Sequence, residues 1–274
     1  MKTIAFCLST LVLILVSMHA HAAETDLNKW DKRITLRGGA LFYNMSGDFS
    51  SNKDDRPKYT VDMDDLGLED DYVTVFLSGS LRLGERWRLH LDYFGYHEDS
   101  TKRSDFEFEY DDVFIPVGAT VDSKLDIDVY VANLSYDIYQ SNRSRISIGL
   151  GAHVADLDLE ISGEARSGDI TLPLGEGDED LLAPLPNIYV SGAYAIRENL
   201  ILNCAGGWMS LSYGDYDGDL LFARGGLEYW PFEHVGFGAG YVYTKADIDY
   251  DPGHKKETYD IKMPGPVVYL AVGF

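Results

Sequence analysis

The feature that most constrains the fold is a two-residue period that recurs along the chain from residue 33 onward. In residues 72–83, Val73 and Val75 share one face, whereas Thr74 and Ser78 share the other. Alternation of this kind is typical of a β-strand with one apolar and one polar face, and no helical period is sustained. Ten segments follow the pattern: residues 33–45, 72–83, 87–96, 125–139, 144–154, 186–196, 200–212, 220–230, 235–244 and 265–274.

The connections between these segments alternate in length. Short links occur at residues 84–86, 140–143, 197–199 and 231–233, and long links fall between them at residues 46–71, 97–124, 155–185, 213–219 and 245–262. Short turns on one side and long loops on the other are typical of outer-membrane barrels. The sequence therefore predicts an all-β fold, a transmembrane antiparallel up-and-down β-barrel of about ten strands, with eight strands as the alternative. An even number puts both chain ends on the periplasmic side.

The distribution of charge along the chain supports the same division into short turns and long loops. Lys and Arg total 23 against 45 Asp and Glu, which gives a formal net charge of −22 and excludes nucleic acid as a partner. The five long links contain 34 acidic and 11 basic residues, so they carry essentially all of the negative excess. A soluble β-domain gives no reason for the excess to lie on alternate connections. We therefore expect acidic extracellular loops above a neutral barrel.

The first 22 residues have the features of a secretory signal peptide. Lys2 provides a positive start, residues 4–18 are mostly apolar, and Ala20-His21-Ala22 places small residues at the positions that signal peptidase reads. The run is too short for a good transmembrane helix. We predict that residues 1–22 are cleaved after Sec export and that residues 23–274 form a single domain in the outer membrane of a Gram-negative cell.

The last segment is typical of a strand that the barrel-assembly machinery recognises. Its apolar face ends on an aromatic residue at the C-terminus and comprises Val268, Leu270, Val272 and Phe274. Other aromatic residues lie near the ends of the segments, as in the two girdles of a membrane barrel. Near the short turns these are Trp87, Tyr139, Tyr229 and Trp230, and near the long loops they are Tyr43, Tyr72, Tyr213 and Tyr243.

Several short stretches carry a resemblance to a known family. They are Asp65-Leu66-Gly67-Leu68, Ala183-Pro184-Leu185-Pro186, Tyr213-Gly214-Asp215-Tyr216-Asp217-Gly218, Gly238-Ala239-Gly240-Tyr241, and Gly265-Pro266 leading to Phe274. On these stretches the chain resembles the small outer-membrane β-barrel proteins of proteobacteria, the outer membrane protein beta-barrel family. The resemblance implies a fold and a location, and it carries no catalytic residue onto this sequence.

Ionisable residues on the polar faces are candidates for an interior network. A barrel of eight to ten strands holds little water, and unpaired charges inside it are costly. We expect the groups to pair into a plug; the alternative is that they line a porin-like path for ions or solutes. The predicted network contains Arg37, Arg82, Arg88, His90, Asp92, Asp137, Arg145, Arg224 and Glu228, and the polar residues Asn133 and His153 lie on the same faces.

Two neighbouring segments change the polarity of their faces part-way along. Near the shared turn, Leu134 and Ile138 lie on the apolar face of one segment, but farther away the apolar set becomes Leu125 and Ile127. Either a pair of β-bulges resets the alternation in an extracellular hairpin, or the barrel turns apolar inward and acidic outward above that level. The second alternative predicts a small apolar pocket lined by Leu125, Ile127, Leu157 and Leu159.

The second alternative also makes the outward carboxylates a candidate cation site. They would hold divalent cations shared with the phosphates of lipopolysaccharide, and they are Asp126, Asp128, Asp156, Asp158 and Glu160. Residues 215–219 place alternate carboxylates before a glycine, but they lack the full calcium-loop spacing and read better as a hairpin turn. Beyond weakly bound Ca²⁺ or Mg²⁺, we expect no cofactor.

The sequence favours a non-catalytic role. No serine lies in a nucleophile motif beside His97 or His153, so no catalytic residue is predicted. We expect an integral outer-membrane protein that supports the envelope or passes small or apolar solutes, with outer-membrane lipid and lipopolysaccharide as partners. The alternatives are an adhesion or recognition module that acts through the acidic loops, and a lipid A-modifying enzyme. The sequence does not indicate an oligomeric state.

Overall fold

The computed structural model describes residues 30–53, 59–105, 107–110, 113–167, 170–251, 253 and 255–274. The predicted signal peptide, residues 1–22, lies outside the described residues. No helix among the described residues is long and apolar enough to cross a membrane.

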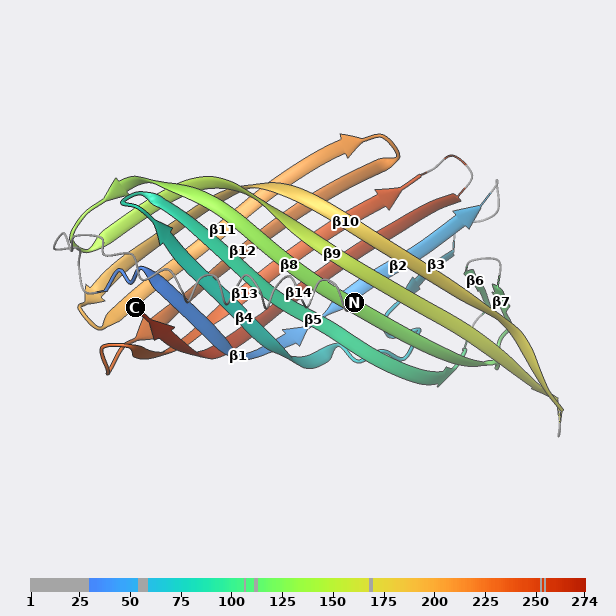
Figure 1. Ribbon diagram of the computed structural model, residues 1–274. Helices are drawn as coiled ribbons and strands as arrows, with labels where there is room; N and C mark the ends of the chain where they lie inside the picture. Colours follow the sequence, from blue (N-terminus) through green and yellow to red (C-terminus); the bar gives the residue numbers. More distant parts are fainter. Residues whose placement is uncertain are drawn as a thin grey trace, which may run out of the picture.

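The described residues form antiparallel strands throughout (Figure 1). Their bounds are β1 Ile34–Asn44, β2 Ser46–Lys53, β3 Tyr59–Asp62, β4 Asp71–Leu83, β5 Trp87–Arg103, β6 Phe108–Tyr110, β7 Val113–Ile115, β8 Thr120–Gln140, β9 Ser144–Ser167, β10 Ile170–Arg197, β11 Leu200–Tyr213, β12 Tyr216–Tyr229, β13 Val235–Tyr250 and β14 Lys255–Gly273. β6 and β7 form a separate two-stranded hairpin.

The remaining twelve strands form one sheet that closes on itself. The ring runs β1-β4-β5-β8-β9-β10-β11-β12-β13-β14, and β14 returns to β1 through pairs from Thr35↔Gly273 to Leu41↔Val267. β2 and β3 continue the sheet along the other half of β14, beyond the end of β1. The all-β up-and-down barrel predicted from the sequence is confirmed, and the ring contains the ten predicted segments in their predicted order.

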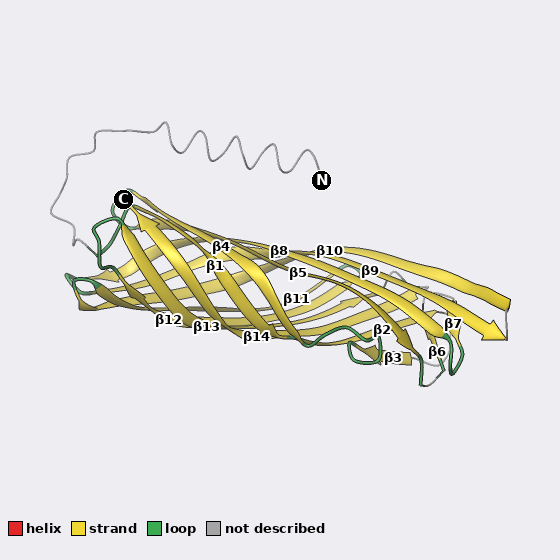
Figure 2. Cartoon of the chain, turned by 90° about the horizontal axis from the view of Figure 1, so that it is seen from below, coloured by secondary structure: helices red, strands yellow, loops and turns green. Residues whose placement is uncertain are grey.

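Most of the predicted long loops are in fact strands. β9 and β10 have 24 and 28 residues, whereas about 9–11 residues suffice to cross a membrane. Their hairpin occupies most of the expected loop 155–185 and extends past the other strands at the end opposite the short turns (Figure 2). The expected loop 213–219 is only the two-residue turn Gly214-Asp215, in which Gly214 has a φ of 62°.

The barrel has two halves with opposite side-chain distributions. In the lower half, which adjoins the short turns, large apolar side chains such as Leu134, Leu150 and Leu270 are exposed on the outer face. In the upper half, most of the buried residues inside the barrel are apolar, and they include Phe49, Ile127 and Tyr259. The outer face of the lower half is therefore suited to hydrocarbon, whereas the upper half has an interior like that of a soluble protein.

The aromatic girdle prediction is only partly correct. Trp87, Tyr139 and Tyr229 are exposed at the lower end, but Trp230 is buried against Ala271. Trp230 follows the end of β12 and folds into the lower mouth instead of facing outward. Tyr43 is also buried, because it occupies an inward position of β1 and packs edge-on against Phe94. Its cross-strand partner Tyr72 points inward too and packs against Tyr96 in the core. The side chain of Tyr213 lies outside the described part of the structure.

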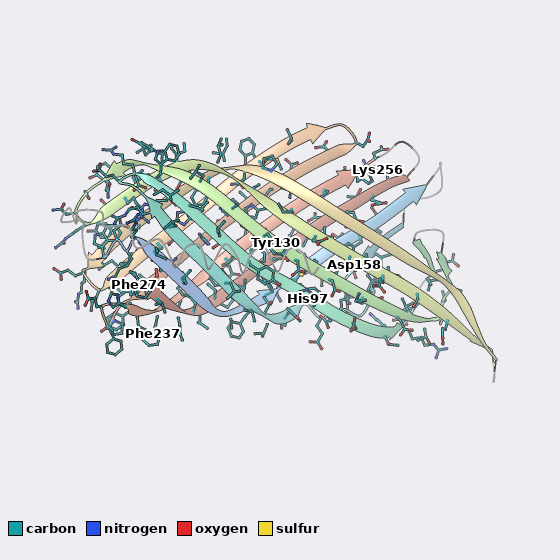
Figure 3. The ribbon with its side chains drawn as sticks, in the orientation of Figure 1. His97, Tyr130, Asp158, Phe237, Lys256 and Phe274 are labelled. Carbon is teal, nitrogen blue, oxygen red and sulfur yellow. The ribbon has the colours of Figure 1, made fainter. Side chains whose placement is uncertain are left out.

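The four residues of the predicted assembly signal lie on one face of β14. Val268, Leu270, Val272 and Phe274 are all exposed on the outer face of the lower half. Phe274 and Phe237 lie together at the lower end in Figure 3. The end of the chain is fixed to the first strand, because Ile34 and Phe274 exchange backbone N–H···O bonds of 2.9 Å.

Candidate functional site

A carboxylate from outside the strands organises the lower mouth of the barrel. Asp31 precedes β1 and is buried, and it accepts two hydrogen bonds from Arg88, at 2.9 and 2.6 Å. Arg145 lies 2.5 Å and Arg82 lies 3.4 Å from the same carboxylate. Three guanidiniums from β4, β5 and β9 thus share one acid, and we call these four residues the Asp31 cluster.

The segment around Asp31 is held across the mouth on both sides. The Trp30 indole donates a hydrogen bond to the carbonyl of Asn142 in the β8–β9 turn, at 2.9 Å. The Lys32 ammonium donates to the carbonyl of Glu233 near the β12–β13 turn, at 2.6 Å. These contacts tie the segment to turns on two sides of the ring, so it forms a cap over the lower end.

A second buried acid extends the Asp31 cluster upward. Asp137 accepts hydrogen bonds from Arg88 Nε at 2.9 and 3.1 Å and from the Ser147 hydroxyl at 2.6 Å. Arg145 Nε lies 3.9 Å from Asp137. A buried carboxylate is stable only when its oxygens are paired and hydrogen-bonded, and this one has both kinds of partner.

Two further ion pairs lie higher in the lumen. Arg37 contacts Glu228 at 3.0 Å, and the Asn203 amide donates to the same carboxylate at 3.1 Å. Arg224 contacts Asp92 at 2.9 Å across 132 residues of sequence. Since each guanidinium reaches a carboxylate on another strand, the pairs cross-link the wall and fill its interior.

The histidines of the predicted network have aromatic and amide neighbours. His90 lies beside the ring of Tyr189, with a centroid distance of 5.6 Å. His153 Nδ1 lies 3.2 Å from the Asn187 side-chain oxygen, and Asn187 donates in turn to Asn133 at 3.1 Å. The structure therefore brings all nine predicted residues into one lumen. It also adds Asp31, which the search for alternating strands missed because it precedes the first one.

The change of polarity along β8 and β9 occurs without a bulge at that level. Their register is continuous from Thr120↔Glu164 to Asp137↔Ser147, and it shifts only below, between Asp137 and Tyr139. The bulge alternative is therefore wrong. The expected apolar pocket is wrong too, because its four residues are at most 2% exposed and belong to the packed core; they are Leu125, Ile127, Leu157 and Leu159.

The outer wall of the upper half carries the predicted carboxylates. Asp126 pairs across the sheet with Asp158, and Asp128 with Asp156. Like charges placed directly opposite destabilise a sheet by about 0.2–1 kcal/mol per pair. Tyr130, His97 and Asp158 are labelled near one another, midway along the barrel, in Figure 3. We call the five carboxylates Asp126, Asp128, Asp156, Asp158 and Glu160 the acidic wall.

Lys124 balances part of the acidic wall. Its ammonium lies 2.7 Å from Glu160, 3.3 Å from Asp126 and 3.9 Å from Asp158. The hydrogen bond to Glu160 and the contact with Asp126 raise the pKa of the lysine above its ordinary value, so the lysine remains charged. The described residues contain no group of three or more acidic, histidine or cysteine side chains arranged to hold a metal ion. The predicted cation site is therefore not a preformed metal centre, and Lys124 occupies its upper end, opposite Glu160.

The hydrogen bonds of Asp128 tie the acidic wall to the aromatic residues below it. Asp128 accepts a hydrogen bond from the Tyr93 hydroxyl at 2.7 Å, and His97 Nε2 lies 3.4 Å from it. Tyr93 and Tyr130 lie beside one another on the outer face, with centroids 5.2 Å apart. This places a tyrosine pair directly between the apolar outer face of the lower half and the acidic wall. His97 is opposite Asp126 in the register of β5 and β8, so its contact with Asp128 runs diagonally across the two strands.

The comparisons with known proteins bear on the fold. No protein-family model matches the sequence, and no curated protein is significantly similar to it. The structure is similar to that of the outer membrane protease OmpT from Escherichia coli, with a TM-score of 0.55 and 8% identity over 92% of this chain and 100% of that chain. The chain has the fold of an outer-membrane β-barrel.

Other solved structures of the same class superpose less well. The outer membrane protein OprG from Pseudomonas aeruginosa has a TM-score of 0.38 and 14% identity over 90% of this chain and 99% of that chain. The toluene transporter TodX from P. putida has a TM-score of 0.36 and 10% identity over 89% and 91%. At these identities the likeness extends to the fold and not to an activity.

The Asp31 cluster predicts a stability effect from a single isosteric change. Asp31→Asn should lower the free energy of unfolding by about 3–5 kcal/mol, because it leaves three buried guanidiniums with one carboxylate. Urea titration of protein refolded into lipid vesicles, followed by tryptophan fluorescence, measures the difference.

The matched control is Asp215→Asn in the exposed β11–β12 turn. Its free energy of unfolding should stay within about 0.5 kcal/mol of the parent. Equal losses in the two variants would mean that Asp31 contributes no more than a surface carboxylate.

Proposed function

We propose that the protein is a non-conducting, non-catalytic component of the Gram-negative outer membrane that acts through the acidic wall, in contact with lipopolysaccharide. The observation that carries the proposal is a lumen that is blocked in both of its halves. Buried ion pairs occupy its lower half, and a packed apolar core occupies its upper half. Because the lumen is blocked, we assign the function to the outer wall of the barrel.

Passage of solutes is the less favoured role. An open path would require the Asp31 cluster to separate, which would leave charges unpaired in a low-dielectric interior. It would also require a route through the packed side chains of the core, such as Leu41, Leu66 and Tyr96, which are fully buried. Both barriers would have to be removed together.

Contact with lipopolysaccharide is supported by the height and the charge of the acidic wall. The wall begins directly above the Tyr93 and Tyr130 pair, where the apolar outer face ends. Lipid phosphates at that level would be repelled by carboxylates alone. Divalent cations that accept oxygen ligands from both sides would join them, with lipid phosphates completing the coordination that the protein lacks. The weakly bound Ca²⁺ or Mg²⁺ expected from the sequence takes this role.

The location and the assembly route belong to the same proposal. An exposed apolar face on β14 that ends at Phe274 is the surface that the barrel-assembly machinery would read after Sec export and signal removal. The proposed relatives are the small outer-membrane β-barrel proteins of proteobacteria. The proposed role involves no catalysis; His97 contacts Asp128, and His153 contacts Asn187.

Recognition of a cationic partner at the cell surface is the second candidate. The β9–β10 hairpin extends beyond the other strands, and the chain carries a net charge of −22. A long, stiff, acidic projection would attract positively charged surfaces over roughly a Debye length of about 8 Å at physiological salt.

Closure of the lumen predicts the electrical behaviour. The purified protein in a planar bilayer should give no conductance steps, because neither half of the lumen contains a continuous open path for ions. Asp31→Asn should also remain silent, since the apolar core still closes the upper half. Regular steps from the parent protein would contradict a closed barrel.

Contact through divalent cations predicts a metal-dependent retention of lipid. Lipopolysaccharide should stay with the purified protein in Mg²⁺ and be released by a chelator. Replacing Asp126, Asp128 and Asp156 by Asn should lower the retained amount several-fold in Mg²⁺. Phosphate analysis of the washed complex provides the measurement.

A charge-matched control lies on another part of the barrel. Replacing Asp215, Asp217 and Asp219, three exposed carboxylates of the β11–β12 hairpin, removes the same charge at a different place. This variant should retain lipopolysaccharide like the parent. If both triple variants lose it equally, net charge explains the binding and the acidic wall has no special role.

A further inference from the structure

A small cavity lies in the lumen beside the ion pairs. Its volume is about 100 Å³, and it is lined by residues from nine strands of the ring. The polar side chains that matter for the argument are Arg37, His90, Arg145, Ser191, Asn203 and Arg224. Since about 10–15 Å³ of such space is enough to hold one water, the cavity has room for several waters or for one small ion with part of its hydration shell.

The lining of this cavity is rich in donors and contains no acid. Three guanidiniums line it, and no aspartate or glutamate is among its lining residues. The carboxylates that fix these guanidiniums, such as Glu228 and Asp92, lie outside the lining. The cavity is therefore an electropositive space whose walls are fixed by ion pairs formed elsewhere.

Three buried polar atoms of the lining have no hydrogen-bond partner within the described chain. They are Arg145 Nε, Ser191 Oγ and His90 Nε2. Ser191 is 8% exposed. The guanidinium nitrogen carries a hydrogen and the hydroxyl can donate one, so at least two donors lack an acceptor. A buried donor left unpaired costs about 1–3 kcal/mol, and an acceptor in the cavity would remove that cost.

The charges inside the lower half do not balance. The lumenal ion pairs of the described residues join five guanidiniums with four carboxylates. The pairs of Arg37 with Glu228 and Arg224 with Asp92 are neutral, so the surplus belongs to the Asp31 cluster, where Arg82, Arg88 and Arg145 share Asp31 and Asp137. Arg145 is the member of that cluster that lines the cavity.

We propose that this cavity binds one small monovalent anion, of the size and charge of chloride. One negative charge balances the surplus guanidinium, whereas a divalent oxyanion would leave an excess of the opposite sign. The unpaired donors supply its hydrogen bonds, and the volume admits a halide. The ion lies between the Asp31 cluster below and the apolar core above, and its binding stabilises the assembled form.

Bromide provides a direct test on the parent protein. The protein is refolded and crystallised in sodium bromide, and anomalous diffraction is recorded at the bromine edge. The expected result is a peak in the cavity, within hydrogen-bond distance of Arg145 and Ser191. A cavity that contains only water, with no anomalous peak, would overturn the proposal.

Stability measurements provide the second test. The melting temperature of the parent, refolded in sodium bromide, should exceed by about 3 °C its value in sodium gluconate at the same ionic strength, because gluconate is much bulkier than a halide and fits a site for a small ion less well. Arg145→Gln restores equal numbers of buried charges, so it should fold and lose this dependence.

The exposed turn residue Arg197 provides the matched control. Arg197→Gln should keep the full difference between bromide and gluconate. If Arg145→Gln does not fold, Ser191→Ala replaces it and should reduce the difference by removing one donor. An unchanged difference between bromide and gluconate in Arg145→Gln, or in Ser191→Ala where that variant replaces it, would contradict the proposed site. An equal loss of the difference in Arg197→Gln would contradict it as well.

Discussion

Closure of the sheet is the constraint on which the rest of the structure depends. A strand edge in hydrocarbon would leave backbone N–H and C=O groups without partners, and each such group costs several kcal/mol. The pairing of β14 with β1 removes the edge over the lower half, from Thr35↔Gly273 to Leu41↔Val267. Above that level β14 pairs with β2 instead, which is possible because water can satisfy an irregular edge there.

Closure also explains why the interior and the exterior exchange character along the same strands. On β8, Asp137 points inward and Ile138 outward below, whereas Ile127 points inward and Asp128 outward above. The pleat is unbroken, so the same positions face the lumen throughout. What changes is the outer solvent, from lipid to water, and the polarity of each face changes with it. The filled lumen follows, with ion pairs beneath and an apolar core above.

Two-residue alternation was sufficient to predict the ten-stranded ring and the lumenal arginines, because both follow from which positions face inward. The same reasoning failed where it assumed that the outer face of a strand meets a single solvent along its whole length. The acidic extensions of β9 and β10 were predicted as loops, since carboxylates at every second position resemble solvated chain. Asp31 was missed because no alternation marks a residue before the first strand. The ion pairs could not be assigned either, since Arg224 and Asp92 meet only when the ring closes.

The outer face of one continuous strand meets lipid below and water above. Spin labels at Leu134 and Asp126, two outward positions of β8, test this change of solvent in vesicles. The label at Leu134 should collide with oxygen and be shielded from a water-soluble nickel chelate, and the label at Asp126 should show the reverse. Equal access of the nickel chelate to both labels would mean that the outer face of β8 meets the same solvent at both levels.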